Sequence, residues 1–114
     1  MATHGEHAML TPENITLFRA YLASLVPDKP IPAIMSFAVS HDIEYKKQKE
    51  MFAQWQQPLL AAMAPFNGRI VDGIGHPNMT LHGPPAMYEK LIDTPELLTN
   101  VKTLEKYYEL STDI

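Results

Sequence analysis

The sequence has no cysteine among its 114 residues. Disulfide bonds, thiol catalysis, iron–sulfur clusters and cysteine-based zinc sites are therefore excluded. Basic residues are also few, because 9 lysines and arginines stand against 13 acidic residues and give a formal net charge of -4. A chain with this balance lacks the positive surface that a general nucleic-acid-binding protein needs.

Long apolar runs are absent as well. The longest mostly apolar stretch, 31–39, is interrupted by Pro32 and Ser36 and falls well short of the roughly 18 residues of a membrane span. The opening residues MATHGEH resemble neither a secretory signal nor an arginine-rich transit peptide. We therefore expect a cytoplasmic protein without a membrane segment.

What the chain does contain is enough apolar sequence for a core. Apolar residues make up 46% of the chain and charged residues 19%, a balance typical of folded domains. At this length we predict a single compact domain over 1–114. Residues 1–10 are polar and carry histidines, and they are predicted to form an N-terminal arm.

Helical signals recur along the chain. Thr-Pro-Glu at 11–13 combines a cap, a first-turn proline and an acidic residue, and the same tripeptide stands at 94–96. The second copy is followed by apolar residues at spacings of 4, 3 and 4, namely Leu97, Val101, Leu104 and Tyr108. Together with the other periodic segments, these patterns predict helices over 12–26, 42–64 with a kink at Pro58, 85–92 and 95–110.

The helical period stops at residues 67–85, which hold four of the five glycines and three of the ten prolines. Two short strands over 69–74 and 78–82 are predicted here as a hairpin, and 34–39 is a candidate third strand. The predicted fold class is α+β and predominantly helical, with about four helices packed on a small antiparallel β element. The alternative is an all-α bundle in which 33–64 forms a bent helical hairpin and 67–85 an ordered loop.

Two of the five histidines flank the turn of this predicted hairpin. If His76 and His82 converge, Asp72 and His41 could complete a set of nitrogen and oxygen ligands for zinc or non-haem iron. The spacing of these residues matches no established metal motif. We therefore predict that the protein has no cofactor, and a bound divalent metal is the alternative prediction.

The same loop could form the pocket of a small enzyme. His76, His82, Asp72 and His41 would then be the catalytic candidates. Arg69 would hold an anionic substrate, and the glycines at 73 and 75 would shape the pocket. Whether the chain is an enzyme is left open by the sequence.

Methionine and tyrosine suggest a different role. The chain has seven methionines and five tyrosines, and methionine is frequent on adaptable binding surfaces. We expect an apolar face rich in these residues that includes Met87, Leu104, Tyr107 and Tyr108. The leading hypothesis is a small non-catalytic binding protein, either an accessory or regulatory subunit or a self-associating domain, whose partner is a protein. The alternative is the enzyme or metal-dependent binder with its pocket at 68–83.

Overall fold

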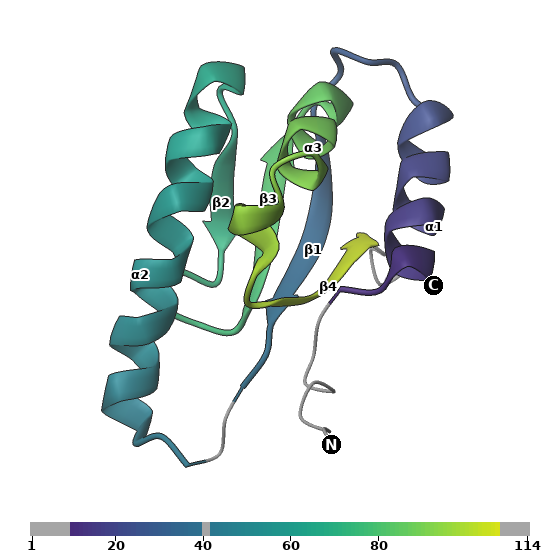
Figure 1. Cartoon of the computed structure of the whole chain (residues 1–114). Coiled ribbons are helices and arrows are strands. Elements are labelled where there is room, and N and C mark those ends of the chain that lie inside the picture. The colour runs from purple at the N-terminus through teal and green to yellow at the C-terminus, as the bar shows by residue number, and fades with distance from the viewer. Residues whose placement is uncertain (1–9, 40–41, 108–114) are drawn as a thin grey trace, which may run out of the picture.

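A computed structural model of the chain describes residues 10–39 and 42–107. These residues form three α-helices: α1 (Pro12–Ala23), α2 (Tyr45–Met63) and α3 (Pro85–Ile92). They also form four strands: β1 (Ile31–Phe37), β2 (Arg69–Asp72), β3 (Asn78–Gly83) and β4 (Val101–Lys106). The strands make one antiparallel sheet in the order β2-β3-β1-β4 (Figure 1).

The connections of the sheet follow a repeated pattern. After α1, the order is β1-α2-β2-β3-α3-β4. Helix α2 joins β1 to β2 across β3, and α3 joins β3 to β4 across β1. This is the split-βαβ arrangement of ferredoxin-like domains, which specifies an architecture but no activity. Helices α2 and α3 cover one face of the sheet, whereas α1 lies beside the edge strand β4 (Figure 1).

The core lies between the sheet and the helices α2 and α3. Alternate residues of β1 are buried, as a strand with one covered face requires. Phe37 of β1 packs against Phe52 and Trp55 of α2, with ring centroids 5.3 to 5.8 Å apart. The most deeply buried apolar side chains are Ala33, Met35, Leu59, Met63, Leu81, Met87, Tyr88, Leu91 and Val101.

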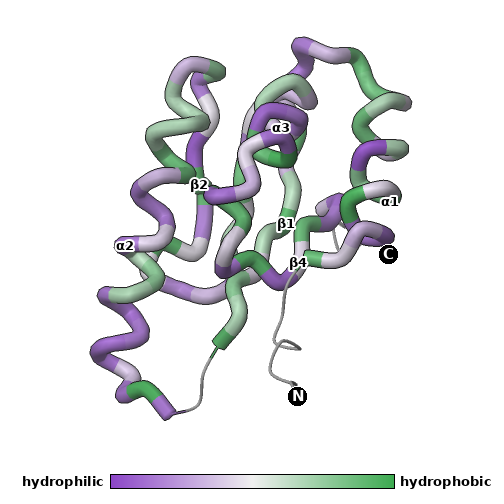
Figure 2. The backbone as a smooth tube through the Cα atoms, in the orientation of Figure 1, coloured by the Kyte–Doolittle hydropathy of each residue, from purple (hydrophilic) through white to green (hydrophobic). Residues whose placement is uncertain are grey.

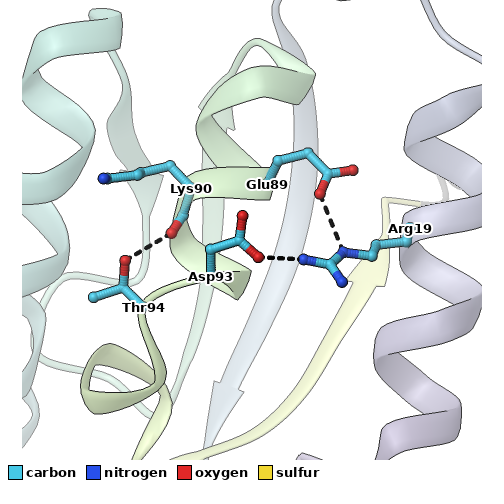
Figure 3. A network of polar contacts seen from close by, with 5 residues as sticks. All are labelled: Arg19, Glu89, Lys90, Asp93 and Thr94. Carbon is cyan, nitrogen blue, oxygen red and sulfur yellow. Dashed lines mark hydrogen bonds and ion pairs between the residues drawn. The ribbon is translucent and has the colours of Figure 1, made fainter.

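Helix α1 is attached to α3 by an apolar contact and by ion pairs. The buried ring of Phe18 meets the ring of Tyr88 edge-on, with centroids 5.6 Å apart. On the surface, Arg19 donates through Nε to Glu89 at 3.1 Å and through Nη2 to Asp93 (Figure 3). Because these charges are exposed, they orient α1 more than they stabilise the fold.

The prediction of a fourth helix over 95–110 is wrong. Pro95–Leu98 forms a short 3₁₀ helix, and β4 follows it. Met35 and Phe37 are two residues apart in β1 but lie opposite Leu104 and Val101, which are three residues apart in β4. Because of this irregularity, the buried residues of β4 have the spacing expected for a helix. The segment nevertheless forms a strand, because it hydrogen-bonds to β1.

The sheet is also larger than the predicted β element. Segment 34–39 falls largely within β1, which is a central strand, and β4 completes four strands. The all-α alternative is therefore wrong as well. The predicted helices over 12–26, 42–64 and 85–92 correspond to α1, α2 and α3, and α2 runs through Pro58 as one helix. All but one residue of the arm predicted over 1–10 lies outside the described residues.

Candidate functional site

The glycine-rich turn between β2 and β3 is held in place by α2. Gln56 is 1% exposed, and its Nε2 donates to the carbonyl oxygens of Gly73 at 3.0 Å and His76 at 3.3 Å. Its Oε1 accepts from the N–H of Gly75 at 2.9 Å. Gly73 and Gly75 have φ values of +97° and +78°, which side chains disfavour. The two glycines therefore serve the backbone geometry of a tightly bonded turn.

The two histidines of this region lie in different settings. His76 is exposed in the turn, whereas His82 is half-buried on β3 and lies opposite Arg69 of β2. His82 alternates with the buried Leu81, so it faces away from α2 and α3. Asp72 is exposed and lies opposite Thr80, on the same face of the sheet as His82.

The predicted metal set is not assembled within the part of the chain that the structure describes. No three His, Asp or Glu side chains of residues 10–39 and 42–107 are grouped closely enough to hold a metal ion. His41 lies outside the described residues. Arg69, Asp72 and His82 do share one face of the β2–β3 pair, which is the extent to which the predicted pocket residues come together.

The predicted interface residues separate into core and surface. Met87 and Leu104 are 0% and 1% exposed and belong to the core. Met87 Sδ fills the space above Gly68 and Gly83, where a Cβ would come within 2.1 and 2.3 Å of it. Tyr107 is 38% exposed after the end of β4, and Tyr108 lies outside the described residues.

Between α1 and the edge strand β4 lies a groove that the sequence reasoning missed. It has a volume of about 660 Å³, within the range of about 300–1,000 Å³ typical of ligand sites. Its apolar lining comes from Leu17, Phe18, Tyr21 and Leu104. Its polar lining comes from Thr11, Glu13, Asn14, Glu105 and Lys106. We call this site the α1/β4 groove.

The spacing between the two walls of the groove is fixed by Asn14. Its Nδ2 donates to the carbonyl oxygen of Leu104 at 2.8 Å, and its Oδ1 accepts from the N–H of Leu104 at 3.3 Å. The side chain thus pairs with β4 as a neighbouring strand would. The backbone N–H of Asn14 in turn donates to Thr11 Oγ1, the cap of α1, at 3.1 Å. The groove is therefore built on the first turn of α1.

The groove combines an apolar floor with charged side chains. Glu13, Leu17 and Tyr21 are four residues apart and share one face of α1. The side-chain carboxylates of Glu13 and Glu105 make no hydrogen bond or ion pair with other described residues. Lys106 Nζ lies 5.4 Å from the centroid of the Tyr21 ring, within the range of a cation–π contact. The stripe at 13, 17 and 21, beside the core stripe of α1, is the sequence signal that could have indicated this site.

Tyr88 packs against Phe18, one of the residues that line the groove. Its hydroxyl donates to the carbonyl oxygen of Ile31 at 2.8 Å, and its ring contacts Phe18. Burial raises the pKa of Tyr88 well above its ordinary value, and the nearby Tyr21 adds to the rise. The phenol therefore stays neutral and ties α3 to both β1 and α1.

Comparison of the chain with protein-family models, curated proteins and solved structures gave no match in any of the three. Within the described residues, none of the helices has the length and apolar character needed to cross a membrane. Support for a function therefore comes from the geometry of the groove.

Proposed function

We propose that this protein is a non-catalytic binding module that holds an apolar group of a protein partner in the α1/β4 groove. The observation that carries the proposal is Leu17, which is 71% exposed although it lines a concave site beside Phe18 and Tyr21. A large apolar side chain in such a position is typical of a surface that a partner covers.

The walls of the groove are held before any ligand arrives. Asn14 bonds α1 to β4, Arg19 pairs α1 with α3, and the floor residue Leu104 is buried. A preorganised site orders few groups when it binds, so more of the interaction free energy contributes to affinity.

The enzyme or metal-dependent alternative gains less support. It needs His76, His82 and Asp72 to converge, and the described residues place His76 in the turn and His82 on the sheet face. We also propose a cytosolic location, since a chain without cysteine gains nothing from an oxidising compartment.

The proposal can be tested with the ¹⁵N-labelled chain and a panel of substituted benzenes and indoles. We expect chemical-shift changes concentrated at residues 13–21 and 104–106. Leu17→Asp should abolish these changes. Val26→Asp, at a side chain that is 58% exposed outside the groove, should leave them intact. Shifts scattered over the surface, or shifts that survive Leu17→Asp, would contradict the proposal.

A further inference from the structure

Building on the proposed function, we propose that the partner is a second copy of this chain, whose Tyr45 occupies the α1/β4 groove. Tyr45 and Leu17 are each 71% exposed, the highest values among the large apolar side chains of the described residues. Tyr45 lies in the first turn of α2, whereas Leu17 lines a concave site that an apolar side chain can enter.

Tyr45 continues the core-facing stripe of α2 beyond the sheet. It precedes the buried Phe52 and Leu59 at intervals of seven residues, so the three share one helix face. The first turns of α2 extend past the β2–β3 turn (Figure 1). Tyr45 therefore lies on the helix face that packs against the sheet farther along α2. At the position of Tyr45 the helix has passed the sheet, so the side chain is exposed.

The side chains around Tyr45 complement the charges of the groove. Lys49 lies one turn after Tyr45 on the same face, and Lys46 adjoins it. The first turns of α2 are coloured mainly as hydrophilic (Figure 2). In the groove, the side chains of Glu13 and Glu105 have no partner among the described residues, and they line it together with one cation, Lys106, whose Nζ lies 5.4 Å from the Tyr21 ring centroid. An inserted Tyr45 would bring Lys46 and Lys49 toward these two carboxylates, with Lys106 beside them.

Three carboxylates, those of Asp42, Glu44 and Glu50, also lie at this end of α2. The charge complementarity is thus between individual side chains near Tyr45 and individual side chains that line the groove with Leu17. It is not a match between two patches of opposite net charge, so we expect its dependence on salt to be moderate.

The placement of the two surfaces determines the kind of assembly. Helices α1 and α2 lie on opposite sides of the molecule (Figure 1), so Tyr45 cannot reach the groove of its own chain. Each copy then offers one Tyr45 and one groove, and head-to-tail contacts form a ring or an open chain of copies. Because Asn14 already pairs both backbone groups of Leu104, the contact is made by side chains and not by strand addition at that point.

Light scattering of the full chain over a range of concentrations tests this assembly. We expect the mean mass to rise above the 12.9 kDa of a single chain as concentration increases. Leu17→Asp and Tyr45→Asp should each weaken association at least about 30-fold, the loss typical of a central anchor residue. Val26→Asp serves as the matched control and should associate like the unmodified chain. All three side chains are exposed, so the variants should fold, which circular dichroism can verify.

Mixing the two defective variants gives the sharpest result. Tyr45→Asp keeps an intact groove and Leu17→Asp keeps an intact Tyr45, so an equimolar mixture should form a dimer that cannot grow further. A mixture that stays monomeric, or association that only one of the two substitutions weakens, would overturn the head-to-tail contact. So would an unmodified chain that remains monomeric up to about 1 mM. If fragments bind the groove while the chain stays monomeric, the proposed function stands and only the identity of the partner fails.

Discussion

The two edges of the sheet are finished in different ways. At β4, helix α1 lies along the edge and Asn14 pairs with both backbone groups of Leu104. At the opposite edge, β2 has only four residues, its register shifts between Ile70 and Asp72, and it is mostly exposed. Both devices discourage unwanted strand pairing. Covering an edge with a helix also creates a groove between the two elements, so the protected edge at β4 is the one that gains a binding site.

The largest expected effect lies on the β2 side. Gly73→Ala should lower the free energy of unfolding by about 3 kcal/mol, because φ is +97° and the new Cβ would come within 2.3 Å of the Asn78 carbonyl oxygen. Gly75→Ala is the control, since its nearest neighbour is the flexible Lys49 side chain at 3.3 Å. We expect it to cost about 1 kcal/mol. Equal losses in urea unfolding would contradict the backbone clash at Gly73.

Removing the amide that holds the β2–β3 turn should have the next largest effect. Gln56→Leu deprives the backbone groups of Gly73, Gly75 and His76 of their partner, and we expect a loss of about 2 kcal/mol. Gln57→Leu, at an exposed neighbouring position, should be nearly neutral. Amide exchange at Gly75 should accelerate only in the first variant; unchanged exchange there would show that the turn does not depend on Gln56.

Alkaline pH should lower the free energy of unfolding through Tyr88, which joins α3 to β1 and to α1. Because the pKa of Tyr88 is raised in the folded state, the fold binds the phenol proton more tightly than the unfolded chain does. The stabilisation is complete below the ordinary tyrosine pKa of about 10 and is lost as pH rises above it, by about 1.4 kcal/mol per pH unit. Tyr88→Phe should flatten this decline in unfolding measurements. A decline that persists unchanged would assign it to other groups.

Asn14→Ala should leave the backbone groups of Leu104 without their partner at the edge that α1 covers. The loss of two hydrogen bonds to Leu104 should cost about 1 kcal/mol. Amide exchange at Leu104 should accelerate, while exchange in β2 stays as it was. Asn14→Asp keeps an acceptor for the Leu104 N–H but sets a carboxylate oxygen against the Leu104 carbonyl oxygen to which Nδ2 donated, so it should cost more stability than alanine. A smaller loss than that of alanine would argue against the two-bond pairing.

The smallest effect should come from the ion pairs between α1 and α3. Arg19→Met removes contacts to Glu89 and Asp93, and we expect a loss of about 0.5 kcal/mol at low salt that shrinks as salt is added. Lys47→Met is a matched removal of an exposed charge. If the two variants lose equal stability, the Arg19 contacts contribute nothing beyond general charge effects.

Segments with local signals could be located from the sequence. Thr11 caps α1 as its Thr-Pro-Glu signal indicates, and the glycines at 73 and 75 mark the turn after β2. Strand β4 could not be recognised, because its helical spacing comes from an irregular pairing with β1 that only the folded sheet determines.

The binding site was harder to predict than the elements that form it. The periodic pattern places Leu104 on an apolar stripe but does not show which other elements cover that stripe. The groove depends on Asn14 meeting β4, and a polar residue inside a helix gives no sign of a partner far along the chain. Contacts of this range follow from the topology of the sheet, which the local patterns left undetermined.

The bond between Asn14 and Leu104 joins residues 90 positions apart, which bears on how the protein is made. On the ribosome, α1 emerges early and must wait for nearly all the described sequence before β4 can receive it. The groove is thus completed only after β4 has been made, and a nascent chain that stalls before Val101 would carry only one of its walls.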